Sequence, residues 1–228
     1  MHFFEIDRFL FDYQKGQGLP QAILAHIRGG IEAAGQDEES ILIFSGGETR
    51  SMTGPVNEGT SYYRVADAMN LWTEDAVSSA TVRARTTTEE FATDSFQNLM
   101  FSICRFREVT GHYPKRITIV SFSFKKKRFV ELHAPALRWP SNALEYIGHD
   151  PEESTGFNLK QASIGELKSA ALPFETDPYG CNSKILQEKR EGRNPFRRRA
   201  PYELTCPEMK SLLNWCGPEL IGETNVPW

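Results

Sequence analysis

Two glycines follow a short apolar run in the first quarter of the chain, within the string Ser45-Gly46-Gly47-Glu48-Thr49-Arg50. The run itself, Ile41–Phe44, has the length and the turn-residue boundary of a buried strand. Glycine adopts backbone angles that let a loop approach an anion closely, and loops at strand ends bind ligands in open α/β sheets. The pattern predicts a ligand-binding loop, and a tight turn without a ligand is the alternative. The residues expected to bind are Ser45, Gly46, Gly47 and Arg50.

A run of four basic residues, Lys125 to Arg128, follows a second apolar stretch, Arg116–Phe124, whose β-branched and aromatic residues are typical of a strand. At the carboxyl end of such a strand, an anion would meet helix amide groups and a cationic side chain together. A charge run is also typical of a solvated helix face, so one or two of the four are expected to point inward. We expect Ser121, Lys125 and Arg128 to contact the ligand.

Acidic and polar residues occur where helices are predicted. Glu58 opens a helix expected over 58–71, and Thr87 with Glu90 forms a capping box that predicts a helix running to Gly111. A carboxylate beside a bound anion can act as an acid or a base, which makes Glu58 a candidate catalytic residue. The second helix would carry a polar stripe that either binds the ligand or faces solvent. The stripe consists of Glu90, Asp94 and Asn98.

Predicted strands and helices alternate along the first 150 residues. Helices are expected over 20–35, 58–71 and 87–111, and strands over 41–44, 80–84, 116–124 and 144–147. This alternation is typical of a mostly parallel sheet covered by helices, so we predict an α/β fold with a three-layer, Rossmann-like open sheet over residues 1–150. From about Asp150, prolines and glycines interrupt short helical pieces at 167–172 and 208–215. Residues 151–228 are therefore expected to form an irregular helical appendage packed on that domain.

Composition argues against several classes of protein. The 228 residues carry a net charge of −4, which gives no overall attraction to nucleic acid, and no stretch is apolar enough to span a bilayer. The four cysteines lack the spacing of a disulfide framework, and the five histidines are scattered. We therefore expect no metal site and a reducing, cytoplasmic location.

One basic segment, Lys189–Arg199, could bind nucleic acid or phosphoinositide. Glu188 and Glu191 lie beside and within it. Because these glutamates interleave the basic residues, pairing within the chain is the favoured interpretation.

Over about Ile41 to Ile147, the order and spacing of several motifs resemble those of the YdcF-like/SanA-like family of domains of unknown function. The resemblance rests on Ser45-Gly46-Gly47, Glu58, the Glu89/Asp94-Ser95/Asn98 helix, and Val120-Ser121 followed by Lys125 and Arg128. It implies a Rossmann-like fold, adds Glu89 as a second acid or base candidate, and adds Asp94, Ser95 and Asn98 as ligand contacts. S-adenosylmethionine, which a bacterial relative binds, becomes a cofactor to test.

Other features refine this resemblance. The strings Asp177-Pro178-Tyr179-Gly180-Cys181 and Arg193-Asn194-Pro195-Phe196 look like those of the eukaryotic, fungal-type branch. Ser95 and Gln97 stand where the family usually has Thr and Glu, and Lys125 stands where bacterial members have His. The family also begins with a strand and a first ligand loop that this chain lacks, so we expect an N-terminally shortened domain with one poorly paired strand edge. Residues Phe3–Ile6 are the substitute strand that would otherwise fill the gap.

These patterns lead to two hypotheses. In the first, the protein binds a small anionic or nucleotide-like ligand at the strand ends and acts as a transferase or hydrolase, with Arg50, Lys125 and Arg128 holding negative charge. In the second, it is a non-catalytic ligand sensor or scaffold with the same fold. Neither hypothesis fixes an oligomeric state.

Overall fold

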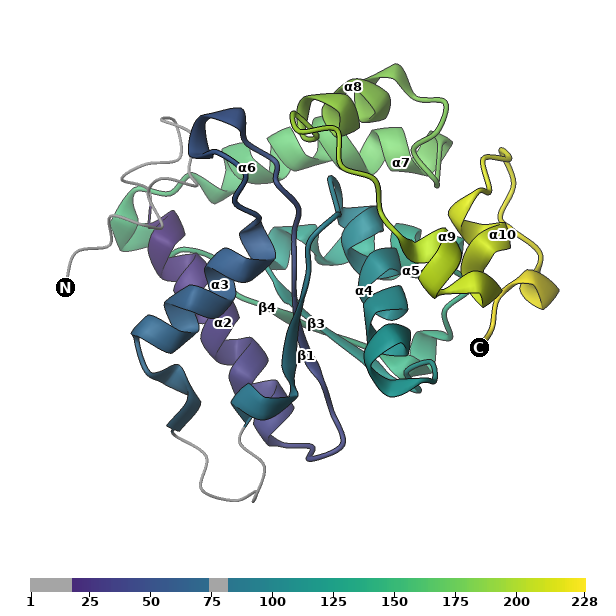
Figure 1. Cartoon of the computed structure of the whole chain (residues 1–228). Coiled ribbons are helices and arrows are strands. Elements are labelled where there is room, and N and C mark those ends of the chain that lie inside the picture. The colour runs from purple at the N-terminus through teal and green to yellow at the C-terminus, as the bar shows by residue number, and fades with distance from the viewer. Residues whose placement is uncertain (1–17, 74–81) are drawn as a thin grey trace.

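The computed structural model describes residues 18–73 and 82–228, in which short strands alternate with helices (Figure 1). In the first part of the chain the helices are α2 (Leu19–Gly35), α3 (Glu58–Ala68) and α4 (Ser95–Thr110). The strands are β1 (Leu42–Ser45), β2 (Thr86–Glu89), β3 (Ile117–Ser121) and β4 (Leu144–Gly148). The mixed α/β class predicted from the alternating patterns is confirmed.

The strands form two parallel pairs. Leu42 of β1 lies opposite Thr86 of β2, and Ile117 of β3 lies opposite Leu144 of β4. The described part of the chain thus contains two sheets of two strands, where one open sheet was expected. Within that part β1 pairs with β2, and because Phe3–Ile6 lies outside the described residues, the poorly paired strand edge stays a prediction. The three-layer, Rossmann-like arrangement stays a prediction.

Helix α2 packs against both sheets, because two adjacent glycines let its backbone come close to them. A Cβ atom on Gly29 would lie 3.2 Å from Val120 Cγ1 in β3, and one on Gly30 would lie 3.1 Å from Leu42 Cδ1 in β1. The helix therefore bridges the two strand pairs from one side.

Helix α4 begins later than predicted. Threonines at 86–88 are β-branched and pair with β1 in strand β2, so the capping box at Thr87 does not form. The helix instead follows Asp94, whose Oδ1 accepts a hydrogen bond from the Gln97 backbone N–H at 2.8 Å. The helix expected over 87–111 was therefore wrong at its start. The stripe of Glu90, Asp94 and Asn98 on one helix face was wrong too, because Glu90 precedes the helix.

Two other elements differ from expectation. The strand expected over 80–84 is wrong in its described part, since Val82–Arg85 forms a 3₁₀ turn. Between β3 and β4 the chain forms a π-helical turn, Arg128–His133, that continues into the short helix α5 (Ala134–Ala136).

The remaining helices are α6 (Leu159–Glu166), α7 (Leu172–Thr176), α8 (Lys184–Gly192), α9 (Tyr202–Thr205) and α10 (Lys210–Leu213). In Figure 1, α6, α7 and α8 pass above the strands, and α9 and α10 lie beside α4. The side chains of Leu186, Tyr202 and Ile221 are fully buried in the same hydrophobic cluster as Phe96 and Ile103 of α4. The C-terminal segment therefore shares a core with the strand-containing part.

A disulfide bond joins Cys181 to Cys216, while Cys104 and Cys206 are free and buried. This bond was not predicted from the sequence, since a separation of 35 residues gave no recognisable spacing. Of the helices in the described ranges, none is both long and apolar enough to cross a membrane.

Candidate functional site

The two glycines after β1 join loops together instead of presenting free amides. The Gly46 N–H donates to the Glu89 carbonyl at 3.0 Å, and the Gly47 N–H donates to the Ala92 carbonyl at 2.8 Å. A Cβ atom on Gly47 would lie 2.7 Å from the Ala92 carbonyl oxygen. Glycine is needed here because two backbones approach closely, so the predicted anion cradle at these two amides is wrong.

Glu89 is the centre of a buried polar network. Its side chain is fully buried, and its Oε2 accepts from Ser45 Oγ at 2.7 Å. Its Oε1 accepts from the Phe91 N–H at 2.7 Å and from the Tyr202 hydroxyl at 3.2 Å. Burial raises the pKa of Glu89, and these hydrogen bonds oppose the shift. Glu89 therefore connects β1 and α9 to the loop after β2 by hydrogen bonds. Its carboxylate is fully buried, so a ligand in solution cannot contact it.

The structure brings Asn98 into this network and leaves Glu58 at its edge. Asn98 Oδ1 lies 3.2 Å from Ser45 Oγ. Glu58, the first residue of α3, accepts a hydrogen bond from Thr49 Oγ1 and is half-buried. The charges of Glu58 and Arg50 both act on the pKa of the Tyr62 hydroxyl, so these two predicted residues lie near each other.

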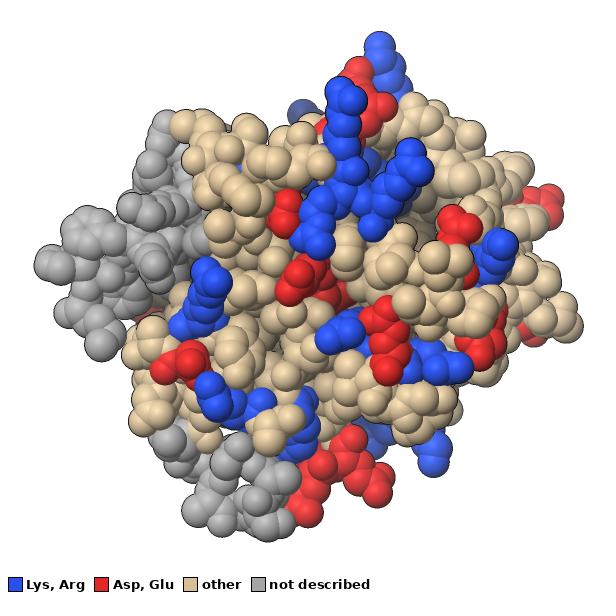
Figure 2. Space-filling model, viewed as in Figure 1, with Lys and Arg blue, Asp and Glu red and all other residues tan. Residues whose placement is uncertain are grey.

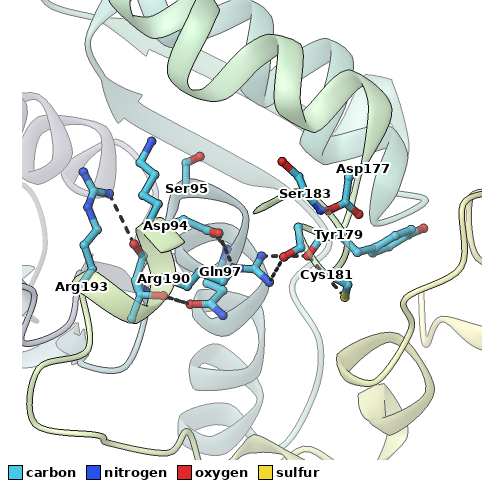
Figure 3. A network of polar contacts seen from close by, with 12 residues as sticks. Asp94, Ser95, Gln97, Asp177, Tyr179, Cys181, Ser183, Arg190 and Arg193 are labelled. Carbon is cyan, nitrogen blue, oxygen red and sulfur yellow. Dashed lines mark hydrogen bonds and ion pairs between the residues drawn. The ribbon is translucent and has the colours of Figure 1, made fainter. Parts of the chain in front are cut away.

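The C-terminal segment is anchored to the loop before α4 by Arg190 of α8 (Figure 3). Arg190 Nε lies 2.6 Å from Asp94 Oδ2, and its other nitrogens donate to the carbonyls of Tyr179 and Gly180. The Asp94 side chain is 2% exposed, and both of its oxygens have partners within the chain. Asp94 therefore positions the C-terminal segment through a buried carboxylate whose two oxygens both bind groups of the chain.

Other residues of the basic segment also bind within the chain. Arg193 donates to the Thr93 carbonyl, and Arg198 pairs with Glu48 while its guanidinium lies 4.5 Å from the centre of the Phe91 ring. The favoured interpretation of the basic segment, pairing within the chain, is confirmed for these residues. Figure 2 shows positive side chains gathered over α8 with negative ones beside them.

The charges of Arg128 and Arg193 act on both Lys125 and Lys189. These four residues define the cationic cluster: Lys125, Arg128, Lys189 and Arg193. Arg128 is 6% exposed and forms a buried ion pair with Glu166, in which Nε lies 3.4 Å from Oε1 without hydrogen-bond geometry. Burial, and then the charges of Arg128 and Arg193, lower the pKa of Lys125 to about 7. Burial and the same two charges lower the pKa of Lys189 to about 8. The cluster is thus short of negative charge.

The Lys125 amine rests on aromatic rings. Its Nζ lies 4.7 Å from the centre of the Phe122 ring, and no ion pair to it is present among the residues that the structure describes. Glu58 and Glu166 are the carboxylates whose charges act on it. The charge of Arg128 also acts on the Lys125 pKa, and the role of both residues in ligand binding stays a prediction.

Ser95 and a histidine that the sequence did not single out lie next to this cluster. Ser95 Oγ is 2.8 Å from Nε2 of His133, which is fully buried. Burial and the charges of Arg128, Arg190 and Lys189 hold the pKa of His133 well below its usual value. His133 is the last residue of the π-helical turn that begins at Arg128, and π-helical turns often occur at functional sites.

Ser121 belongs to the other strand pair from Ser45. It is the last residue of β3, its carbonyl accepts from the His149 N–H, and its side chain contacts Tyr146. Among the described residues, hydrogen bonds therefore join Ser45, Glu89 and Asn98 in one buried network, and the contacts of Ser121 are with Tyr146 and His149.

Two further searches of the described residues bear on a site. No group of three or more His, Cys, Asp or Glu side chains in residues 18–73 and 82–228 could hold a metal ion. An open groove of about 600 Å³ is lined by Tyr113, Trp139 and Trp228, among others, and none of the sequence-predicted site residues lines it.

Comparison with known proteins gives a relative without an assigned function. The chain is 35% identical over 201 residues to YOR238W, an uncharacterised protein of Saccharomyces cerevisiae. The match covers 72% of this chain and 66% of the yeast protein, so the chain spans just under two thirds of that protein's length. No family model and no solved structure matches the chain. The YdcF-like resemblance thus stays a prediction.

Proposed function

We propose that this protein binds a small anionic ligand that carries phosphate or carboxylate groups, such as a nucleotide, at the cationic cluster. The observation that carries the proposal is the charge imbalance there. Arg128 pairs with Glu166, and Asp94 pairs with Arg190, whereas no ion pair to Lys125 or Lys189 is present among the described residues. Arg128 is buried and Lys125 and Lys189 are half-buried, so holding these like charges together partly out of water costs free energy, and a bound anion would offset that cost.

The position of the cluster supports the same proposal. Lys125 follows β3, and Ser95 begins α4, so strand-end and helix-start residues meet as in many α/β ligand sites. The net positive charge favours a phosphate-bearing ligand over S-adenosylmethionine, whose sulfonium would add another cation. S-adenosylmethionine is supported by the YdcF-like resemblance alone.

If the protein is an enzyme, Glu58 is the residue that we propose as its acid or base. It is half-buried and its charge acts on Lys125, so it is placed to move a proton at a ligand group in a transfer or hydrolysis. Glu89 is not placed for this, because it is fully buried and hydrogen bonded on both oxygens.

The second candidate function is a non-catalytic sensor or scaffold. The internal hydrogen bonds of Gly46, Gly47 and Glu89 favour it, because groups expected to act on a ligand instead hold the fold together. Turnover of a phosphate ester by the wild type, lost in Glu58→Gln with binding retained, would favour the enzyme.

Calorimetric titration of the full chain with pyrophosphate and with adenosine diphosphate tests the binding proposal. We compare Lys125→Met with Lys126→Met, since Lys126 is the adjacent lysine and is exposed. Loss of a charge-assisted contact should weaken binding in Lys125→Met by about tenfold, and Lys126→Met should stay within about twofold. Absence of binding by the wild type, or equal affinities of the two variants, would contradict the proposal.

A further inference from the structure

His133 is a buried imidazole with a single hydrogen-bond partner. Its Nε2 lies 2.8 Å from Ser95 Oγ, its side chain is fully buried, and Nδ1 has no partner among the described residues. Aromatic rings surround it, with ring centres of Phe174 at 4.6 Å and of Phe129 at 5.3 Å. The imidazole therefore has one polar contact, which makes the direction of that hydrogen bond important.

The surroundings fix the protonation of His133. Arg128, Arg190 and Lys189 are the charges that act on it, and all are positive, so the imidazole is neutral and carries one hydrogen. If that hydrogen were on Nδ1, a buried N–H would lie among aromatic carbons without an acceptor. Orphaned buried N–H donors are rarer than under-used acceptors. The hydrogen is thus on Nε2, which donates to Ser95 Oγ.

This direction of the hydrogen bond determines what Ser95 can do. Because its oxygen accepts from His133, the Ser95 hydroxyl hydrogen is available to another acceptor. An Nε2 that carries a hydrogen cannot take the serine proton, so the pair is not a nucleophile with its base. Ser95 is left as a hydrogen-bond donor at the first residue of α4.

A buried cation lies at the other end of the same turn. Arg128 begins the π-helical turn that His133 ends, it is 6% exposed, and its Nε lies 3.4 Å from Glu166 Oε1 in an ion pair that does not meet hydrogen-bond geometry. Arg193 donates to the carbonyl of Thr93, two residues before Ser95, and the charge of Asp94, the neighbour of Ser95, acts on Arg128 and Lys189. Ser95, the start of α4 and the cationic cluster therefore belong to one place.

We propose that the Ser95 hydroxyl donates a hydrogen bond to an oxygen of a phosphate, sulfate or carboxylate group held by the cationic cluster, and that His133 is the positioning residue that orients this hydroxyl. The ligand contact rests on the function proposed above, whereas the orientation of His133 does not. The ligand class is an oxyanion whose oxygens act only as acceptors.

Nuclear magnetic resonance tests the orientation without any ligand. Long-range ¹H–¹⁵N correlations of the full chain should show His133 as the neutral Nε2–H form, unchanged between about pH 5.5 and pH 8. A hydrogen on Nδ1, or titration of His133 within that range, would overturn the assignment.

Calorimetry with pyrophosphate tests the contact. Ser95→Ala should weaken binding by about tenfold or more, since a hydrogen bond to a charged group is lost. His133→Gln keeps a side-chain N–H donor and should stay within about threefold of the wild type, whereas His133→Met lacks one and should resemble Ser95→Ala.

The variant Ser95→Thr and the melting curves of all variants distinguish loss of the ligand contact from misfolding. Ser95→Thr retains the hydroxyl and should bind as the wild type does. If the wild type binds pyrophosphate and Ser95→Ala binds equally well, the contact is wrong and the proposed function stands. If the wild type does not bind, both are wrong, and the resonance experiment still decides the orientation of His133.

Discussion

Arg190 of α8 and Asp94 at the start of α4 form a mostly buried ion pair, with Nε 2.6 Å from Oδ2, across 96 residues of sequence. Asp94 also caps α4 through its other oxygen. One carboxylate therefore starts the helix that carries Ser95 and holds the segment that carries Lys189 and Arg193.

Removing this carboxylate should destabilise the protein strongly. Asp94→Ala loses the helix cap and leaves a partly buried guanidinium without its partner, which we expect to lower the free energy of unfolding by about 3 kcal/mol. Urea unfolding of the wild type and of Asp94→Ala measures this difference in free energy. Glu188→Ala removes one side of the exposed Lys184–Glu188 pair and should change stability by less than about 0.5 kcal/mol. Similar losses in both variants would show that the buried pair is not special.

Glycine at position 47 should be required for stability and not for a ligand. In Gly47→Ala the new methyl group would lie 2.7 Å from the Ala92 carbonyl oxygen, so the loops must separate. We expect a loss of about 2 kcal/mol. Gly165→Ala in α6 meets nothing within 4 Å and should stabilise by about 0.5–1 kcal/mol. An unchanged melting temperature of Gly47→Ala would contradict the observed loop contact.

The disulfide should contribute measurably to stability. Closing a loop of 35 residues lowers the entropy of the unfolded chain, which stabilises the fold by about 4 kcal/mol, so reductant should lower the urea midpoint of the wild type. The double variant Cys181→Ala/Cys216→Ala should unfold at the reduced midpoint and not respond to reductant. Four free thiols in the oxidised protein by mass spectrometry would disprove the bond.

Anion affinity should fall as pH rises through neutrality. Lys125 attracts an anion when protonated, and its pKa of about 7 means that it loses its charge above that pH. Sulfate is a suitable probe, because its own charge is constant in this range. Its affinity should be highest below pH 7 and fall towards pH 8.5, with Lys189, whose pKa is about 8, contributing the later part. Lys125→Met should lack the fall centred near pH 7, and an identical profile in both proteins would exclude Lys125.

Local patterns predicted much of the chain. The apolar run at 41–44 and the β-branched run at 116–124 gave β1 and β3 within a few residues, and Pro20 with Gly35 bounded α2. The start of α4 was missed because the capping box at Thr87 competes with strand pairing, and that pairing depends on a partner more than 40 residues away. Local sequence does not contain this partner.

The candidate site was only partly predictable for a related reason. Lys125 and Arg128 were predicted as site residues because they lie shortly after a strand. His133 was missed because a π-helical turn, unlike an α-helix, has no periodic signature in its residues. The role of the glycine pair was misjudged because its neighbour, the carbonyl of Ala92, lies on another loop.

A crystal structure of the full chain with pyrophosphate tests the central claim most directly. The account predicts an oxyanion within hydrogen-bond distance of both Ser95 Oγ and Arg128, with Lys125 beside it. Pyrophosphate bound only elsewhere, for example in the groove beside Trp228, with the cationic cluster unchanged, would contradict it.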